Sequence, residues 1–397
     1  MTTLFDPIPI GSMKLGNRFV CSATYEAMAG EDGRVTADLT ARYERLARGG
    51  VGLIVPGHMY VHPRGRAMGK QIGIHDDAML PGLEALADSV HRNGRRIVFQ
   101  LAHAGRQAPR RVTGAAPLAP SGQGLDPASM NRPKKLSEDQ IVAIIQSFAS
   151  AARRAKQAGA DGVQLHAAHG YLLNEFLSPF YNRRRDAWGG SAEKCFRFVR
   201  ETIAAVQKAV GGSIPVLIKI NTCDFTPEPG ITPLLAARYA GWLRTAGIDA
   251  VEVSSGTYYS FHTVRGEIPL DELARGLPSW MRPLAKLKFK SLVKPCAFKE
   301  SYNLPGAEGV RRELGDVPLI LVGGMRRRQQ MEELLEKSAA DLISMSRPFV
   351  REPSLVEKFR EGKSETASCV SCNMCFAAVF NNLALGCYRN GLPMKVS

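Results

Sequence analysis

Eight short apolar segments recur along this chain of 397 residues, and a helical pattern follows each of them. The segments are residues 19–22, 51–56, 96–101, 162–165, 215–220, 250–254, 317–322 and 341–345. Continuous apolar strands between amphipathic helices are typical of a parallel sheet that is covered on both faces. Eight such units predict a closed (β/α)8 TIM barrel. A doubly wound open sheet is the alternative, but the strand count and the absence of G-x-G-x-x-G after the first strand disfavour it.

The end of the chain carries a cluster of cysteines, which are Cys369, Cys372, Cys375 and Cys387. A C-x2-C-x2-C run with a distant fourth cysteine is typical of the ligands of a [4Fe-4S] cluster. Zinc is the alternative, although it more often shows two C-x2-C pairs. We therefore expect a barrel domain over residues 1–361 and a cysteine-rich extension over residues 362–397 that packs on it.

Composition narrows the classes of protein that this chain can represent. The formal net charge is +15, but the positive residues are scattered in short groups, so nucleic acid is not an expected partner. No apolar stretch reaches the roughly 18 residues that a membrane span requires. The N-terminus lacks the apolar core of a signal peptide. We therefore expect a cytoplasmic protein, in which clustered cysteines bind metal more often than they form disulfides.

The fourth strand ends in a cluster of polar rings, with His166, His169 and Tyr171 inside six residues. The carboxyl ends of the strands are where a barrel keeps its catalytic groups. Two imidazoles can donate hydrogen bonds to one oxygen, and a nearby phenol can deliver a proton. These three residues are therefore predicted to be catalytic. The alternative is that the histidines cap the strand end and Tyr171 is a core aromatic residue.

Other strand ends add cofactor-binding features. Gly323 and Gly324 follow the seventh strand and open a helix, and Arg347 follows the eighth strand, which predicts a phosphate site between these two loops. Lys219 ends the fifth strand. It can be a Schiff-base nucleophile, as in an aldolase, or a fixed cation beside an electron-rich ring. Gln100 and Lys219 together suit a ring that bears alternating carbonyl and N–H groups.

Several longer motifs resemble one family, the Old Yellow Enzyme flavin oxidoreductases. They are Q-L-A-H-A-G-R over residues 100–106, H-A-A-H-G-Y over 166–171, N-E-F-L-S-P over 174–179, Asn182-Arg183, Gly189-Gly190, Arg347-Pro348 and Gly16-Asn17-Arg18. The match covers nearly the whole chain. The cysteine tail is similar to the branch with 2,4-dienoyl-CoA reductase, enoate reductase and trimethylamine dehydrogenase. That branch places a [4Fe-4S] cluster beside the flavin.

The resemblance implies FMN in the barrel mouth and assigns residues to it. The ring is implied to lie among Ser22, Ala23, Thr24, Gly57, His58, Gln100, His166 and Lys219, and the phosphate among Gly323, Gly324, Met325, Ser346 and Arg347. Lys219 is implied to lie near flavin N1 and the C2 carbonyl. Tyr25, His166, His169 and Tyr171 are implied to contact the substrate.

The implied activity is that of an ene-reductase, an FMN-dependent oxidoreductase acting on an enone, enoate or enoyl-CoA. Reduced FMN gives hydride to the β-carbon, the two histidines bind the carbonyl oxygen, and Tyr171 protonates the α-carbon. Departures from the family pattern are Ala23 for a proline, Tyr25 for a cysteine of one branch, and Ser346 for a glycine. The alternatives are an FMN and iron–sulfur amine dehydrogenase and an electron-transfer subunit of a larger complex.

The expected partners follow from the same resemblance. Relatives with the cysteine tail continue into FAD- and NAD(P)H-binding domains, whereas this sequence stops at Ser397. We therefore expect electrons from NAD(P)H or from a protein donor, such as an electron-transfer flavoprotein, a ferredoxin or an NADH-oxidising subunit. We also expect a homo-oligomer. Residues 257–304 are predicted to be irregular and to shape a substrate pocket or lid. The residues that suggest this are Tyr258, Tyr259, Phe261, His262 and Trp280. The alternative is that the segment packs on a neighbouring subunit.

Overall fold

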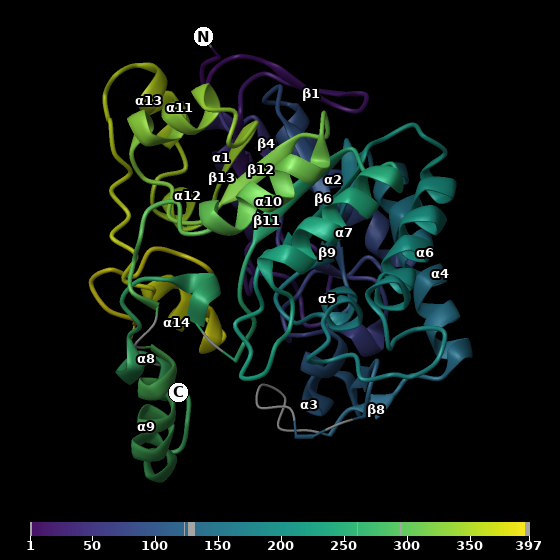
Figure 1. Ribbon diagram of the computed structural model, residues 1–397. Helices are drawn as coiled ribbons and strands as arrows, with labels where there is room; N and C mark the ends of the chain where they lie inside the picture. The colour runs from purple at the N-terminus through teal and green to yellow at the C-terminus, as the bar shows by residue number, and fades with distance from the viewer. Residues whose placement is uncertain (1, 123, 126–131, 260, 294–295, 394–397) are drawn as a thin grey trace.

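The computed structural model describes residues 2–122, 124–125, 132–259, 261–293 and 296–393. Within this part of the chain, eight strands close into one parallel barrel (Figure 1). Around the barrel they are β3 (Phe19–Cys21), β4 (Leu53–Ile54), β6 (Arg96–Ala102), β9 (Gly162–Ala167), β10 (Val216–Asn221), β11 (Ala250–Ser254), β12 (Leu319–Val322) and β13 (Leu342–Met345). The pairings of β13 with β3 and of β4 with β6 complete the ring. The predicted (β/α)8 barrel is therefore confirmed.

Helices cover the outside of the barrel between consecutive strands. The main ones are α1 (Ala37–Arg48), α2 (Leu80–His91), α4 (Glu138–Gln157), α6 (Ala192–Val210), α7 (Pro233–Thr245), α10 (Leu304–Leu314), α11 (Arg328–Glu336) and α13 (Leu355–Arg360). Local sequence explains where several of them begin. Ser137 and Gln140 form a capping box at the start of α4, as their spacing predicts, and Thr36 caps α1 in the same way with its side chain.

Shorter elements complete the described chain. They are the strands β1 (Ile8–Ile10), β2 (Met13–Leu15), β5 (Met59–Tyr60), β7 (Leu118–Ala119) and β8 (Lys134–Lys135), the short α-helices α3 (Arg110–Thr113), α5 (Leu172–Leu177) and α12 (Arg347–Arg351), and the 3-10 turns at Pro63–Gly65, Asp77–Met79 and Gly105–Gln107. β5 pairs with β6 beyond the end of β4. No helix among the described residues combines the length and the apolar character needed to cross a membrane.

The apolar core has two main parts. The larger one fills the space between the barrel and its helices, with Phe99, Phe148 and Phe198 fully buried. A smaller one lies inside the barrel near the beginnings of the strands, where Ile10 and Leu15 of the β1–β2 hairpin pack with Leu217. The hairpin therefore covers the amino end of the barrel, at the top of Figure 1. The carboxyl ends of the strands remain available for a site at the opposite end.

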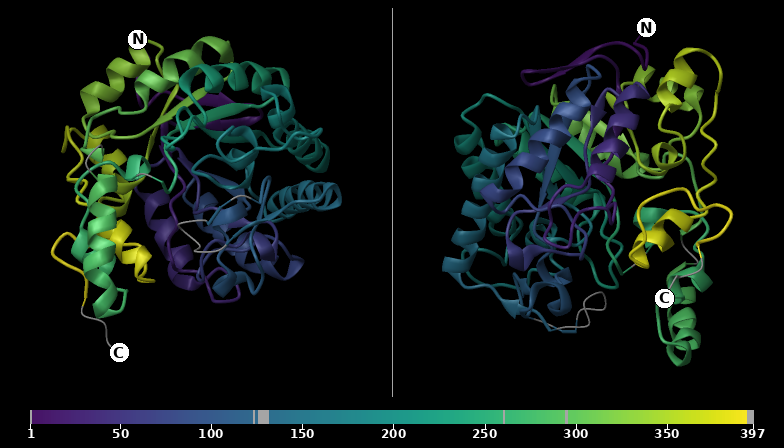
Figure 2. Two further views of the ribbon diagram at one scale, coloured as in Figure 1. Left: turned by 60° about the horizontal axis from the view of Figure 1, so that its bottom comes forward. Right: turned by 180° about the vertical axis from the view of Figure 1, so that it is seen from behind.

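Residues 257–304 differ from the irregular segment predicted by the sequence. They form a 3-10 turn (Phe261–Val264), α8 (Leu270–Ala274), a second turn (Ser279–Met281) and α9 (Arg282–Val293). The sequence signal was weak because α8 is a single turn and α9 begins with Pro at its second position. Figures 1 and 2 show α9 projecting beyond the rest of the molecule. Trp280 is 78% exposed there, so it is not part of a pocket wall, and the lid and the subunit contact stay predictions. The side chain of Phe261 lies outside the described part of the structure.

The C-terminal extension lies against the barrel and α8. Its helix α14 (Met374–Phe380) buries Ala377 and Ala378 in a small apolar cluster with Leu273 of α8. A second contact joins Val379 and Leu385 to apolar residues of the barrel loops. The extension therefore lies beside the carboxyl end of the barrel, which brings its cysteines near the strand ends.

Candidate functional site

A cavity of about 260 Å³ opens at the carboxyl ends of the strands. From the barrel it is lined by Ser22, Ala23, Thr24, Tyr25, His169, Lys219, Ser254, Gly323, Gly324, Met325, Ser346 and Arg347, among others. Thr263, Phe298 and Tyr302 of the 257–304 segment also line it. Ser371, Cys375 and Phe376 add a wall from the extension. Most of the residues predicted from separate strand ends therefore share one cavity.

The cluster after β9 is brought together as the sequence predicts. The ring centroids of His166 and His169 are 5.1 Å apart, and those of His166 and Tyr171 are 5.0 Å apart. A sharp turn makes this possible, because His169 and Gly170 both adopt positive φ, at 63° and 77°. The Asn174 side chain accepts from the Gly170 N–H at 2.6 Å and so holds the turn. His169 lines the cavity, whereas His166 and Tyr171 lie buried immediately behind it.

Burial fixes the protonation of these rings. It lowers the pKa of His166 and of His169 well below the usual value, and the nearby charge of Lys219 adds to the effect in both. Burial raises the pKa of Tyr171 above its usual value. Both imidazoles are therefore neutral and the phenol is protonated at neutral pH. Each neutral imidazole has one N–H to donate, and the phenol has a proton to give.

Two neighbours orient the cluster. The Tyr171 hydroxyl lies 3.1 Å from His58 Nε2, and burial lowers the pKa of His58 to about 4. His58 is therefore a neutral hydrogen-bond partner of Tyr171. Ser254 Oγ lies 2.8 Å from His169 Nε2. His166 Nδ1 is buried and has no hydrogen-bond partner among the described residues, which leaves one polar atom for a ligand.

A buried charge network underlies the cavity and was missed in the sequence. Glu252 of β11 is fully buried, and its Oε1 accepts from Lys219 Nζ at 3.1 Å and from Ser22 Oγ at 2.7 Å. Its Oε2 accepts from Gln164 Nε2 at 3.0 Å, and Gln164 in turn accepts from Gln100 Nε2 at 2.6 Å. The signal was present, because Glu252 is a carboxylate inside the apolar strand A-V-E-V-S.

The predicted phosphate loops form a basic end of the cavity. Gly323 and Gly324 have φ of 122° and 76°, and a side chain at Gly324 would collide with the Lys299 carbonyl. Arg347 donates to the Asn373 side chain at 2.6 Å, so it also contacts the extension. Arg326 lies over the Phe298 ring, and its buried Nε has no partner among the described residues. Backbone N–H groups and arginines at this end can hold an anion.

Some predicted cofactor residues are not in the cavity wall. Gly57 donates its N–H to Glu26 Oε1 at 2.7 Å, and the carbonyl of His58 accepts from Gln71 Nε2 at 3.0 Å. Gln100 bonds to Gln164 inside the barrel. These residues are buried behind the lining, as are His166 and Tyr171. Gln100 is linked through Gln164 and Glu252 to Lys219 of the cavity wall, and His58 bonds to Tyr171.

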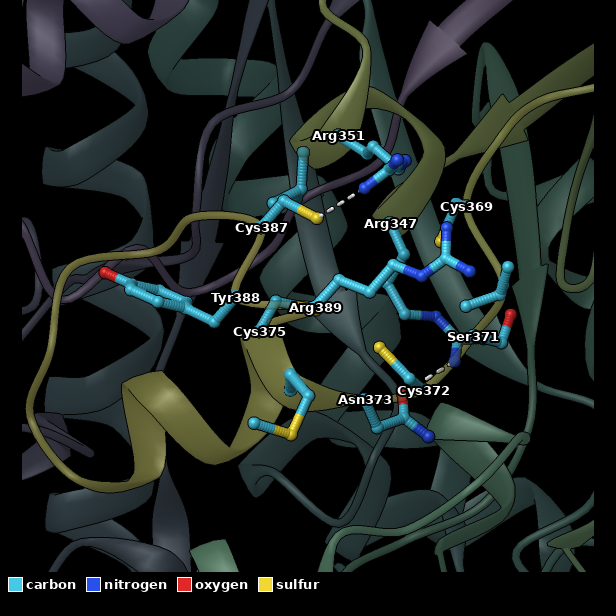
Figure 3. A pocket seen from close by; sticks show the side chains of 13 residues that line it. Arg347, Arg351, Cys369, Ser371, Cys372, Asn373, Cys375, Cys387, Tyr388 and Arg389 are labelled. Carbon is cyan, nitrogen blue, oxygen red and sulfur yellow. Dashed lines mark hydrogen bonds between the residues drawn. The ribbon is translucent and has the colours of Figure 1, made fainter. Parts of the chain in front are cut away.

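The four clustered cysteines line a second, smaller pocket beside the first (Figure 3). Arg351 Nη1 lies 3.3 Å from Cys387 Sγ, and none of the four is in a disulfide. Among the described residues, no three His, Cys, Asp or Glu side chains converge closely enough to hold one metal ion. A four-iron cluster binds each thiolate at a different iron, so it requires four thiols around a space and not at a point. Cys375 lines both this pocket and the large cavity.

Comparison with known proteins identifies relatives along nearly the whole chain. The family model described as NADH:flavin oxidoreductase / NADH oxidase family matches residues 3–269 and 282–366. An NADH oxidase of Thermoanaerobacter brockii is 34% identical over 394 residues, which are 98% of this chain and 56% of that protein. A 4,4'-dithiodibutanoate disulfide reductase of Rhodococcus erythropolis is 32% identical over 381 residues, 95% of this chain and 93% of that protein.

A solved structure agrees with these relatives. The complex of 2-naphthoyl-CoA reductase with 2-naphthoyl-CoA superposes with a TM-score of 0.81 at 26% identity, over 97% of this chain and 56% of that one. The chain therefore spans about half the length of this protein and of the NADH oxidase, and nearly all of the disulfide reductase. The four clustered cysteines follow the last residue that the family model matches.

Proposed function

Because the chain belongs to the NADH:flavin oxidoreductase / NADH oxidase family, we propose that it is a flavin-dependent ene-reductase. The Old Yellow Enzyme resemblance seen in the sequence is confirmed at the level of the family, whose members are FMN-dependent oxidoreductases. The observation that carries the proposal is the convergence of His166, His169 and Tyr171 at the end of β9. The substrate class is an α,β-unsaturated carbonyl compound. A 2-naphthoyl-CoA reductase among the structural relatives supports a conjugated thioester as one form of it.

The cavity fits FMN on two counts. Its basic end has Gly323, Gly324 and Arg347 for a phosphate, and buried nitrogens of Arg326 and His166 lack partners among the described residues. Ser22, Ala23, Thr24 and Lys219 line the cavity and would contact the ring, with Gly57, His58, Gln100 and His166 buried behind them. Met325 and Ser346 would complete the phosphate site. When bound, FMN supplies the hydride.

The protein residues polarise the substrate and supply its proton. The neutral imidazoles of His166 and His169 donate N–H groups to the carbonyl oxygen, where negative charge develops as the double bond is reduced. For His169 this requires Ser254 to donate to Nε2, which leaves the proton on Nδ1. Tyr171, protonated and held by His58, gives its proton to the α-carbon. Tyr25 lines the cavity beside this cluster and is a substrate contact.

We further propose that the extension, residues 362–397, binds a [4Fe-4S] cluster through Cys369, Cys372, Cys375 and Cys387. The four thiols line one pocket, and Cys375 also borders the proposed flavin cavity. The cluster would receive electrons that originate from NAD(P)H and pass them to the flavin. The donor to the cluster would be a protein, namely an electron-transfer flavoprotein, a ferredoxin or an NADH-oxidising subunit. The net charge of +15 favours an acidic donor.

The charge of the cavity disfavours the amine dehydrogenase alternative. The described residues that line it include Lys219, Arg326 and Arg347 and no carboxylate. A cationic amine is favoured by aromatic neighbours together with a carboxylate, and this lining supplies aromatic rings such as Tyr25 and Phe298 without a carboxylate, whereas an anionic or carbonyl ligand suits it. The substrate is therefore proposed to be neutral or anionic.

The decisive experiment separates the two half-reactions of Tyr171→Phe. We expect normal reduction of FMN and a loss of roughly 10²- to 10⁴-fold in its reoxidation by an enone, because the variant lacks the proton donor. Stopped-flow absorbance of the flavin measures both steps. Tyr239→Phe is the matched control, since Tyr239 is a buried tyrosine of α7 that donates to the Leu177 carbonyl. Normal reoxidation of Tyr171→Phe would contradict the ene-reductase and favour an electron-transfer subunit.

A further inference from the structure

Glu252 occupies a position inside the barrel where an uncompensated carboxylate would be very unfavourable. Its side chain is 0% exposed, and that of Lys219 is 4% exposed. Three donors converge on Oε1, namely Lys219 Nζ at 3.1 Å, Ser22 Oγ at 2.7 Å and Ser344 Oγ at 3.0 Å. Both carboxyl oxygens accept hydrogen bonds, and one of the donors is a lysine, which is the arrangement of a carboxylate in an ion pair. Lys219 and Glu252 therefore form a buried ion pair with hydrogen bonds on both members.

The same carboxylate fixes the direction of two amides. A carboxylate can only accept, so Gln164 must present its Nε2 to Glu252, at 3.0 Å, and its Oε1 to Gln100. Gln100 must then donate through its own Nε2, at 2.6 Å. The two residues proposed to lie nearest the polar edge of the flavin, Gln100 and Lys219, are thus both held by Glu252.

We propose that Glu252 is a positioning residue that cancels the charge of Lys219 beneath the flavin and so keeps the FMN reduction potential below the value that a lone lysine would impose. This inference rests on the proposed function, because it requires FMN in the cavity. Charge near flavin N1 is one of the ways in which a protein tunes this cofactor. The electrostatic potentials of two opposite charges in contact largely cancel at a neighbouring flavin ring. A single buried charge has no such partner, so its full potential acts on the ring.

The test compares FMN midpoint potentials in four proteins, the wild type, Glu252→Gln, Lys219→Met and the double variant. Each is loaded with FMN, and its occupancy is measured before the titration against a reference dye. We expect Glu252→Gln to favour reduced FMN by roughly tenfold, which is about 30 mV for a two-electron couple. Lys219→Met should shift the potential in the opposite direction. The double variant, in which the pair is again neutral, should return close to the wild type.

A lysine that acts alone gives a different pattern. In that case Glu252→Gln has the wild-type potential, and the double variant matches Lys219→Met; either result overturns the proposal. If Glu252→Gln does not fold, the double variant and Lys219→Met still decide, because the proposal requires the double variant to have the higher potential. Ser344→Ala removes a hydrogen bond from Glu252 but no charge, so its shift should be the smallest. A chain that takes up no FMN would instead refute the proposed function.

Discussion

The large cavity and the cysteine pocket beside it form two ends of one site, a barrel end and a cysteine end, and they are built in opposite ways. At the barrel end, residues far apart in the sequence hold one another, such as Lys219 with Glu252 and Tyr171 with His58. At the cysteine end, four thiols come from the single stretch between Cys369 and Cys387, and they form no disulfide. Positive φ occurs at both ends, at 63° for His169 and at 55° for Ser371 and Asn373, and it costs a non-glycine residue about 1 kcal/mol or more. Contacts within the protein fix the side chains at the barrel end. At the cysteine end, a bound ligand would fix more of the side-chain positions.

The largest expected effect tests this contrast at the cysteine end. We expect Cys372→Ser to lose its iron and sulfide while it keeps FMN, because a hydroxyl is a poor ligand for iron and Cys372 lines the cysteine pocket but not the large cavity. Chemical determination of iron, sulfide and FMN after anaerobic purification measures the result. Cys223→Ser is the control, since Cys223 follows β10 and lies outside the cysteine pocket. Loss of FMN together with iron would show that the two ends are not independent.

A second experiment tests the barrel end. We expect His169→Ala to slow reoxidation of the flavin by an enone about 10²- to 10³-fold, because one donor to the carbonyl oxygen is removed. FMN and iron contents should be unchanged. Ser254→Ala should have a smaller effect in the same direction, because it removes only the partner that orients His169. Stopped-flow reoxidation at several enone concentrations separates the rate from binding. A rise in the apparent Kd alone, with an unchanged limiting rate, would contradict the oxyanion role.

The contrast also explains what the sequence could and could not predict. His166, His169 and Tyr171 were found because they lie within six residues after an apolar strand, and the cysteines because their spacing is local. The barrel followed from the period of its apolar segments. Glu252 was missed because its partners are on other strands, and the register that brings them together is not encoded in any local pattern.

The role of His58 shows the same limit. The resemblance placed His58 beside the flavin, and that placement remains a proposal. Its hydrogen bond to the Tyr171 hydroxyl joins the loop after β4 to the turn after β9. Such a contact requires the closed barrel, in which these loops share one end. Long-range partners of this kind are the part of the site that sequence patterns do not contain.

The smallest expected effect concerns pH and the buried histidines of the barrel end. Burial lowers the pKa of His103 to about 3, so the unfolded chain, with an ordinary value near 6.5, binds more protons at this residue between those two pH values. The free energy of unfolding therefore rises with pH across this window and falls as the pH drops below about 6.5. At pH 5 the loss from His103 is roughly 2 kcal/mol, and His58, His166 and His169 add losses of the same sign.

Urea unfolding between pH 7.5 and pH 5 measures this slope in the wild type and in His103→Asn. The variant should have the shallower slope, because one buried neutral imidazole is gone, and an asparagine oxygen can still accept from the Gly105 N–H. His91→Gln is the control, since Asp161 raises the pKa of the partly exposed His91 and its linkage has the opposite sign. Cys372→Ser should keep the wild-type slope. A slope that changes with the cysteine variant and not with His103→Asn would place the acid-sensitive element at the cysteine end and would reverse the contrast between the two ends.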